Sequence, residues 1–338
     1  MGSNRKETSR PVEAEYKTNS IPYRIIGLYP LAEPDPTQQI ELIQAAFNEH
    51  LCNGLEIPYL SNSYRANQDR LWSSLPTGTK HVFTMITATM ECIANNPQFG
   101  LASIDKEGRD AALTMMERAC QTVKAINTAG NHKILAVEIQ SAPSNSVQIQ
   151  ESISAFKHSL EEITSWDWSG AIVCIEHCDA AVRWHLPSKG FLPLNMELAA
   201  LSAVCGTRVT TPAAMSINWA RSAIELRNPN LVENQIRQCS INNVLRGMMF
   251  SGVADEPTKF GPAWSDSHCP PNLHRSVDLD EPSSLLTGQR IAAAKRAVGP
   301  NLLYEGVKIS ARPLNAPIGK RIALLRRTIE LLDNANSE

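Results

Sequence analysis

The sequence lacks any apolar segment that approaches the roughly 20 residues of a membrane-spanning helix, and residues 1–20 lack the apolar core of a signal peptide. Net charge is −2, with no long run of basic residues. The electrostatic footprint of a protein that binds nucleic acid or an anionic membrane surface is therefore missing. We expect a soluble, cytoplasmic protein whose partner is a small molecule, with no nucleic-acid or membrane partner; a homodimer stays open.

Two further patterns are missing. The eight cysteines are scattered and show no paired spacing typical of a zinc site, so we interpret them as reduced, small hydrophobic residues. The first apolar run, RIIGLYP, is followed by no glycine-rich turn that would hold a phosphate. This lack disfavours an open, doubly wound sheet that binds a dinucleotide.

The polar start of the chain differs from the rest. Residues 1–20 show no hydrophobic periodicity, which predicts a disordered N-terminal arm. From residue 21 to residue 338 no break in composition marks a boundary, and this length suits one barrel of about 250 residues with insertions. We predict a single domain over residues 21–338.

Eight apolar runs alternate with helical patterns or long loops, an order typical of a parallel sheet with helical crossovers. We therefore predict an α/β fold, a single (β/α)8 TIM barrel, with the doubly wound sheet as the alternative. The predicted strands are Arg24–Pro30, Gly54–Leu60, His81–Thr87, Lys133–Pro143, Ala171–Ala180, Ala213–Trp219, Asn243–Gly252 and Leu302–Ser310.

The fifth run, AIVCIEHCDA, ends abruptly in charged residues. Successive side chains of a strand point to opposite faces, so Glu176 and His177 must face different sides of the sheet. A structural interpretation, in which Glu176 and Asp179 merely end the strand, is open for this strand alone. The other strands repeat the pattern.

Polar residues share the inward parity near the ends of seven of the eight strands, where barrel active sites lie. Isolated buried charges are costly, so these acids and the lysine must be paired, metal-bound or partly protonated. Such groups are natural candidates for acid and base catalysis. The inward residues are Tyr29, Glu56, Glu138 with Gln140, Glu176, Asn218, Ser251 and Lys308.

Four stretches carry a resemblance to a known group of proteins: FGLAS, WDWSGAIVCIEHCDA, INWARSAIE and MFSG. Over roughly residues 22–335 the chain resembles the xylose isomerase-like TIM barrels, and more narrowly an uncharacterised family among them. That group contains sugar isomerases, epimerases, dehydratases and apurinic-site endonucleases. The resemblance implies an enzyme of carbohydrate metabolism, and the neutral charge of the chain disfavours the endonuclease.

The function we expect is proton transfer next to a carbonyl group of a small polyhydroxylated or carboxylated substrate, as in an isomerase or epimerase. Glu176 and Glu138 would be base and acid, and Lys308 would stabilise a developing enolate oxygen. Trp219 and Trp264 could stack on a sugar. Arg221 and Arg227 could bind a carboxylate or phosphate, unless they form salt bridges to Glu225 or another acid on the barrel rim. The remaining predicted substrate contacts are Glu56, Gln140, Asn218 and Ser251.

A divalent metal ion (Mn, Zn or Mg) is an open alternative, because many barrels of this group hold one with acids and a histidine. Glu176 matches their ligand on the fifth strand, whereas Asn218, Ser251 and Lys308 stand where the other ligands are expected. His177, Asp179 and His268 could complete a site with Glu176, since imidazole and carboxylate suit such ions. We expect lysine and metal to be alternatives, with Lys308 paired to Glu176 or Glu138.

Two other functions stay open. Lys308 could form a Schiff base in an aldolase or other lyase, although nearby carboxylates would raise its pKa and oppose that role. The barrel could also bind a ligand without turning it over. Whichever holds, the long proline-rich segment Val253–Pro282 is expected to lie over the mouth of the pocket and to bring Trp264 and His268 near the end of the fifth strand.

Overall fold

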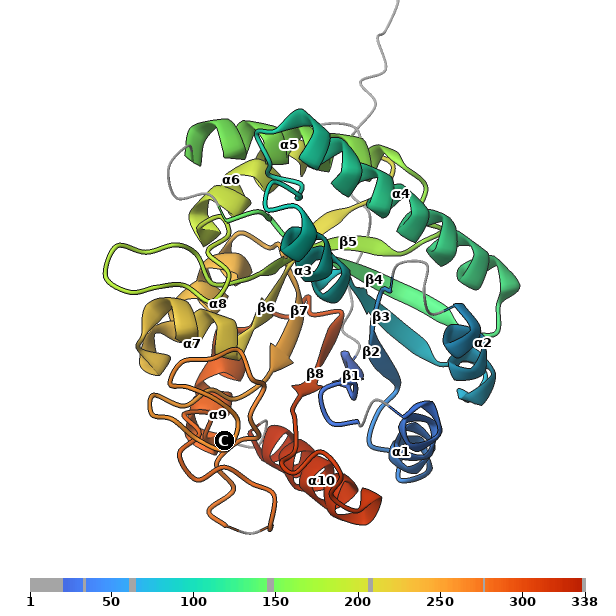
Figure 1. The fold of residues 1–338 in the computed structure, drawn as a ribbon, viewed down its shortest axis with the longest axis vertical. Coiled ribbons are helices and arrows are strands. Elements are labelled where there is room, and N and C mark those ends of the chain that lie inside the picture. Colours follow the sequence, from blue (N-terminus) through green and yellow to red (C-terminus); the bar gives the residue numbers. More distant parts are fainter. Residues whose placement is uncertain are drawn as a thin grey trace, which may run out of the picture.

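A computed structural model describes residues 21–32, 35–60, 65–144, 149–205, 209–275 and 277–335, so the predicted N-terminal arm lies outside the described residues. Eight strands close into one barrel in sequence order, each parallel to its neighbours (Figure 1). The TIM barrel fold is therefore confirmed. The strands are β1 Tyr23–Gly27, β2 Gly54–Pro58, β3 Lys80–Thr84, β4 Lys133–Ile139, β5 Ile172–His177, β6 Ala213–Asn218, β7 Leu245–Phe250 and β8 Tyr304–Lys308.

Helices surround the strands and cover the outside of the barrel (Figure 1). They are α1 Pro36–Asn48, α2 Arg65–Ser74, α3 Ile86–Asn95, α4 Lys106–Ala129, α5 Ile149–Ser165, α6 Leu194–Cys205, α7 Trp219–Leu226, η1 Pro229–Leu231, α8 Val232–Ile241, α9 Gly288–Ala297 and α10 Ile318–Asn334. No helix in the described part of the chain is long and apolar enough to cross a membrane.

The longest helix, α4, shows how the sequence sets its ends. Its N-cap Asp105 accepts a hydrogen bond from the backbone N–H of Gly108 at 2.7 Å, which satisfies one free donor of the first turn. At the other end Gly130 takes the left-handed conformation with φ 79°, which glycine adopts without a Cβ clash. Gly130 therefore ends the helix as a C-terminal glycine stop.

Two helices fall in regions where the sequence indicates none. The interval between the second and third strands contains α2, whose mostly polar sequence RANQDRLWSS gives little hydrophobic periodicity. The third predicted strand, His81–Thr87, is too long, because α3 begins at Ile86. A short apolar run does not by itself separate strand from helix.

The sixth predicted strand is also one residue too long, since Trp219 is the first residue of α7. Asn218 ends β6 and caps this helix, because its Oδ1 accepts a hydrogen bond from the backbone N–H of Ala220 at 3.2 Å. The helix that follows the strand at once carries Arg221 over the end of the barrel.

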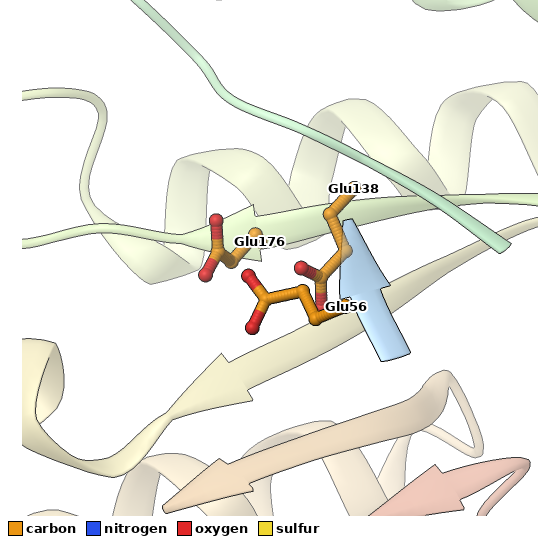
Figure 2. Close-up of side chains that lie close together, drawn as sticks. All are labelled: Glu56, Glu138 and Glu176. Atoms are coloured by element: carbon orange, nitrogen blue, oxygen red, sulfur yellow. The ribbon is translucent and has the colours of Figure 1, made fainter. Parts of the chain in front are cut away.

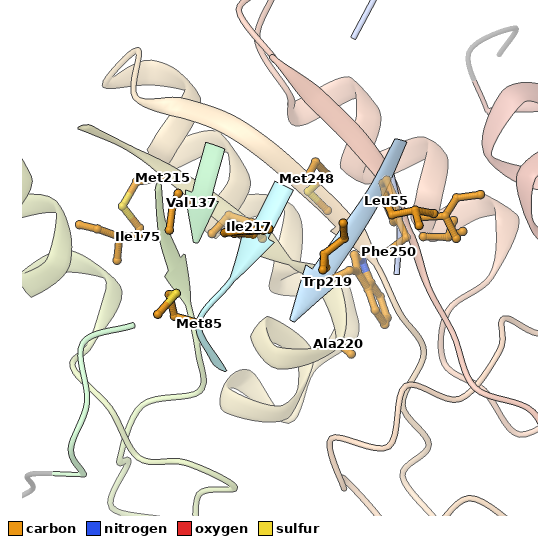
Figure 3. Packing of buried hydrophobic residues seen from close by; sticks show 14 of the residues in the cluster. Leu55, Met85, Val137, Ile175, Met215, Ile217, Trp219, Ala220, Met248 and Phe250 are labelled. Carbon is orange, nitrogen blue, oxygen red and sulfur yellow. The ribbon is translucent and has the colours of Figure 1, made fainter. Parts of the chain in front are cut away.

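Two apolar layers hold the barrel together. The outward side chains of the strands pack against the helices, as Figure 3 shows for Val137, Ile175 and Ile217. A smaller inner layer fills the lower part of the barrel. It comprises Ile25, Val82, Ala136, Ile172, Cys174, Ala214, Met249 and Tyr304. The barrel is thus a packed core on which the polar residues of the strand ends rest.

Tyr304 crosses this inner layer from β8 to β4, where its hydroxyl donates to Glu138 Oε1 at 2.6 Å. Gly247 of β7 leaves room for the ring, because a Cβ at this position would lie 2.3 Å from the Tyr304 phenol. The glycine therefore permits a contact that links the apolar layer to the acids above it.

Candidate active site

Three glutamates from three strands meet in the C-terminal half of the barrel interior. Glu56 comes from β2, Glu138 from β4 and Glu176 from β5, and carboxylate oxygens of all three lie within 4.8 Å of one another. Figure 2 shows the three side chains pointing toward a common space. All three are buried, so their charges must be compensated within the protein.

Two cations lie against these acids. The Lys308 ammonium donates to Glu56 Oε1 at 2.6 Å and lies 4.0 Å from Glu176 Oε1. Arg221 forms an ion pair with the same oxygen of Glu176 through Nη1. Glu176 also accepts a hydrogen bond at Oε2 from Gln140 Nε2, at 2.8 Å. The expected pairing of Lys308 is therefore met in part: its nearest partner is Glu56, and Glu176 is second.

Glu138 and Glu176 are held in opposite protonation states. Burial raises the pKa of Glu176, but the charges of Arg221 and Lys308 outweigh burial and lower this pKa to about 2. For Glu138, burial and the nearby charges of Glu176 and Glu56 raise the pKa to about 8. At neutral pH the pocket therefore contains a protonated carboxyl beside an ionised one, which is the pattern of an acid–base pair.

Several oxygens of the cluster remain without a donor. Oε2 of Glu56 and Oε2 of Glu138 are buried and accept no hydrogen bond from the described residues. An unsatisfied buried oxygen is costly unless a substrate, water or ion completes it. These atoms mark the cluster as a binding site.

The three carboxylates could by type and spacing hold a divalent metal ion. The Lys308 ammonium already contacts Glu56 and Arg221 already contacts Glu176, so both acids are compensated without an ion. A divalent cation added beside two fixed cations would be repelled. Lysine and metal are therefore alternatives at this position.

The segment between β7 and α9 lies over the C-terminal end of the barrel. The carbonyl of His268 accepts a hydrogen bond from the backbone N–H of Ser310, just beyond β8, at 2.7 Å. Asp266 reaches Arg221, whose Nε donates to Asp266 Oδ2 at 3.1 Å. Through Arg221 this segment touches the acids of the site, as expected of a loop over the pocket mouth.

His268 takes part in this closure as a neutral side chain. Its Nδ1 lies 3.4 Å from Asp266 Oδ1, and burial lowers the pKa of His268 to about 3 against the attraction of that carboxylate. Trp264 lies farther out, where the Arg227 guanidinium stacks on its ring at 5.0 Å from the centroid. Within the described residues, Trp264 therefore contacts the rim instead of the three glutamates.

Two predicted substrate contacts, Ser251 and Asn218, are hydrogen-bonded to each other. Ser251 donates its hydroxyl proton to Asn218 Oδ1 at 2.7 Å, while the same oxygen caps α7.

Trp219 is buried in the apolar layer outside the strands, as Figure 3 shows, and does not face the glutamates. The sequence-based role of Trp219 in sugar stacking is therefore not supported by its position.

His177 faces away from the glutamates, as its parity requires. Its Nδ1 lies 2.7 Å from Glu197 Oε2 of α6 and its Nε2 lies 3.1 Å from Glu225 Oε2 of α7. Burial lowers the pKa of His177, but these two carboxylates outweigh burial and raise it to about 10. Glu225 thus pairs with His177. The alternative for Arg221, a salt bridge to Glu225 or another acid of the rim, is wrong for Glu225 and confirmed for another acid, Asp266.

The four residues suggested as metal ligands are not brought together. Both nitrogens of His177 are engaged outside the barrel, and Asp179 Oδ2 accepts hydrogen bonds from the backbone N–H groups of Ser188 at 2.6 Å and Lys189 at 3.0 Å. Asp179 therefore shapes the segment that follows β5. Among described residues, the acids that lie at metal-binding spacing are the three inward glutamates.

Sequence reasoning missed three contributors. Ser216 and Tyr304 both donate to Glu138 Oε1, at 2.7 Å and 2.6 Å. Strand parity could have found them, since each faces inward below the end of its strand. Lys189, which lies in the β5–α6 segment and pairs with Asp266 at 2.6 Å, had no such signal.

The chain belongs to a family described as a domain of unknown function, DUF4862, whose model matches residues 25–324. It is also similar to the uncharacterized protein STM3670 of Salmonella typhimurium (strain LT2). The two are 33% identical over 318 residues, which span 92% of this chain and 97% of that protein.

Solved structures with low sequence identity share the fold. The IOLI protein, whose structure was solved with a bound zinc atom, matches with a TM-score of 0.63 at 11% identity, over 93% of this chain and all of that chain. A D-tagatose 3-epimerase-like protein matches with a TM-score of 0.57 at 13% identity, over 92% and 98%. A family 2 AP endonuclease from Brucella melitensis gives 0.55 at 12%, over 88% and 96%. These likenesses establish the xylose isomerase-like barrel.

Proposed function

We propose that this member of the DUF4862 family is an enzyme that moves a proton next to a carbonyl group of a small polyhydroxylated or carboxylated substrate, in the manner of an isomerase or epimerase. The observation that carries the proposal is the different surroundings of Glu138 and Glu176 in one buried pocket: two hydroxyls donate to Glu138, whereas Arg221 and Lys308 face Glu176. These surroundings raise the pKa of Glu138 to about 8 and lower that of Glu176 to about 2. Neutral and ionised carboxyls side by side can give and take a proton without help from solvent.

Each group has a role that follows from its surroundings. Glu138, protonated at neutral pH, donates a proton from a carboxyl whose Oε1 is fixed by Ser216 and Tyr304. Glu176, ionised, accepts the proton removed from carbon. Lys308, a fixed positive charge, stabilises the oxygen on which negative charge develops when the proton leaves.

The charge of Lys308 also weighs against a Schiff-base mechanism. Burial lowers the pKa of Lys308, but the carboxylate of Glu56 and the other acids around it raise this pKa well above its ordinary value. A charged ammonium has no lone pair with which to attack a carbonyl. An aldolase that uses this lysine is therefore a weaker proposal than proton transfer.

A metal ion bound by the three glutamates would polarise the same carbonyl oxygen as Lys308. The relative with zinc, the IOLI protein, makes this alternative concrete. Metal analysis of the purified protein tests it directly. A stoichiometric metal on Glu176 with Lys308 turned away would replace the lysine mechanism.

The proposed reaction is tested by isotope exchange. The protein is incubated in D2O with a panel of ketoses, aldoses and 2-keto acids, and proton NMR follows deuterium at the carbon next to the carbonyl. We expect exchange with a subset of the panel, and we expect Glu138→Gln to slow it by about 10²- to 10⁴-fold, the usual contribution of a positioned acid or base. A compound that binds tightly and never exchanges would indicate a binding protein instead.

A further inference from the structure

Asp266 occupies a buried site made of two cations. Its Oδ2 accepts a hydrogen bond from Arg221 Nε at 3.1 Å and lies 2.6 Å from the Lys189 ammonium. The side chains are 7% exposed for Asp266, 1% for Arg221 and 9% for Lys189. Burial raises the pKa of Asp266, but Lys189 and Arg221 outweigh it and hold this pKa well below its ordinary value. The site is therefore built to hold an anion.

The two cations and the acid lie in three different segments of the chain. Arg221 lies in α7, which starts directly at the end of β6. Lys189 lies in the segment between β5 and α6, where its backbone N–H donates to Asp179 Oδ2 at 3.0 Å. Asp266 is carried by the long segment between β7 and α9. Arg221 is thus fixed to the end of the barrel, whereas Lys189 and Asp266 come from two loops that meet over it.

The loop carries strain on both sides of Asp266. Trp264 has φ 60° and His268 has φ 51°, a left-handed backbone that side chains with a Cβ seldom adopt. Such residues persist where surrounding contacts hold them, and they gather in segments that move or clamp ligands. The contact of Asp266 with Arg221 and Lys189 is one such hold.

The acids of the proposed reaction are closed off from solvent. Glu138 and Lys308 are 0% exposed and Glu176 is 1% exposed. A pocket lined by Tyr29 and Glu56 reaches the cluster from the side of β1 and β2, whereas a substrate that enters on the Arg221 side must displace the loop after β7. When the loop after β7 lifts, Lys189 loses its carboxylate partner and Arg221 keeps only Glu176. A largely buried ammonium whose partner has left, beside a guanidinium with free donors, favours another anion.

We propose that Arg221 and Lys189 form an anion-binding subsite in which the Asp266 carboxylate stands in for a carboxylate or phosphate group of the substrate. The assignment of that anion to a substrate rests on the proposed function, whereas the subsite itself does not. Asp266 leaves as the substrate binds, and the guanidinium and ammonium then hold the anionic end of the substrate beside the glutamates.

Arg221 connects this subsite to the proposed base. The same guanidinium binds Asp266 through Nε and Glu176 through Nη1. Burial raises the pKa of Glu176, and Arg221 is the group that lowers this pKa most. A substrate anion that draws Arg221 toward itself weakens this hold and makes Glu176 a stronger base.

The subsite is tested with anions alone. Isothermal titration calorimetry of the full chain measures the binding of malonate and of inorganic phosphate at constant ionic strength. Asp266→Asn keeps the shape of the side chain but removes its charge, so we expect it to bind one of these anions at least about 10-fold more tightly than the wild type. Malonate preference indicates a carboxylated substrate, and phosphate preference indicates a phosphorylated one.

A matched control lies in the same loop. Asp278 is exposed and pairs with Lys320, so Asp278→Asn removes a loop carboxylate without freeing Arg221 or Lys189. It should bind anions as the wild type does. Adding Lys189→Met to Asp266→Asn should return the affinity to the wild-type level. Equal affinity of Asp266→Asn and the wild type, or tight binding that survives the loss of Lys189, would overturn the subsite.

A second measurement uses the wild type and serves if Asp266→Asn does not fold. With Asp266 in place, malonate or phosphate at high concentration should raise the thermal unfolding temperature of the wild type, and Lys189→Met should abolish that rise. No protection of the wild type would count against the subsite. Neither calorimetry nor thermal unfolding requires turnover. If the protein binds these anions but catalyses no proton exchange, the proposed reaction is refuted and the anion-binding subsite is not.

Discussion

Glu176 and His177 are neighbours in β5, yet they belong to two buried charge clusters on opposite sides of the strand. His177 lies between Glu197 and Glu225, and both ring nitrogens and both carboxylates have partners. Glu176 lies in the inward cluster, where Glu56 and Glu138 each keep an oxygen without a donor among the described residues. Complete pairing thus separates a structural cluster from one that leaves room for a ligand.

The outward cluster ties β5, α6, α7 and α8 together. Ser141 donates to the second oxygen of Glu197, and Gln235 donates to the second oxygen of Glu225 at 2.7 Å. A buried network whose charged groups all have partners fixes the relative positions of its elements. We therefore assign the His177 cluster to stability and the inward cluster to chemistry, and the following changes test that division.

The largest effect is expected from breaking the outward cluster. His177→Leu leaves two buried carboxylates without their cation, which should lower the free energy of unfolding by about 3–5 kcal/mol. Urea unfolding followed by circular dichroism measures this loss. His81→Leu is the control, because His81 is buried in β3 but bonds to the Leu55 backbone N–H and to Thr79 without any carboxylate.

His81→Leu strands no charge and should cost about 1–3 kcal/mol, the cost of unsatisfied neutral partners. The folded fraction of His177→Leu should catalyse proton exchange at the wild-type rate. A folded His177→Leu variant with normal stability but no exchange would place His177 in the chemistry and reverse the division.

Lys308→Met should reduce proton exchange by about 10²- to 10³-fold, because a contact to a developing oxyanion is worth about 3–4 kcal/mol in the transition state. Stability should change less, since burial raises the pKa of Glu56, which can take a proton once its ammonium partner is gone. Single-turnover exchange rates and urea unfolding separate the two effects.

Lys295→Met is the matched control for Lys308. Lys295 pairs with Glu305 at 3.1 Å, and both side chains are 10% exposed, but this pair lies on the other side of β8 from the glutamates. It should leave exchange unchanged. Equal losses of exchange in both variants would mean that Lys308 acts only by holding the barrel together.

The two clusters should also lose stability over different pH ranges. The pKa of Glu138 is raised from 4.5 to about 8, so its contribution is complete below about pH 4.5 and is lost as pH rises through about 8. The pKa of His177 is raised from 6.5 to about 10, so its contribution is complete below about pH 6.5 and is lost as pH rises through about 10.

Urea unfolding of the wild type, Glu138→Gln and His177→Leu across this pH range measures both contributions. Each variant should lack the pH dependence of the residue that it replaces. Glu138→Gln should flatten the decline below about pH 8, and His177→Leu should flatten the decline above it. A decline below about pH 8 that persists unchanged in Glu138→Gln would show that Glu138 does not titrate there, and the assignment of Glu138 as the acid would lose its support.

The smallest effect is expected at Gly27, which lies beside the Lys308–Glu56 pair. A Cβ there would lie 2.8 Å from Glu56 Oε2 and 2.9 Å from Lys308 Cγ, so Gly27→Ala must displace both side chains. We expect exchange to fall by about 10-fold and stability by about 1 kcal/mol, as for mild overpacking. Gly319→Ala, where a Cβ meets no atom within 4 Å, is the control.

The barrel, and the face of each strand on which its residues lie, could be predicted from the amino-acid sequence alone. Alternation along a strand is a local property with a period of two, so Glu56, Glu138, Glu176 and Lys308 could be placed inward before any contact was known. Helices with weak periodicity, such as α2, were not visible in the same way, because their apolar face is short.

Only the tertiary structure decided which charges meet. Lys308 pairs with Glu56 across 252 residues, and Asp266 joins Arg221 across 45 and Lys189 across 77. Such pairs depend on barrel closure and on the path of a long loop, which no local pattern encodes. The same holds for Glu225. It lies four residues from Arg221 in α7, a spacing that places both side chains on one face of the helix, yet Glu225 binds His177 while Arg221 binds Glu176 and Asp266.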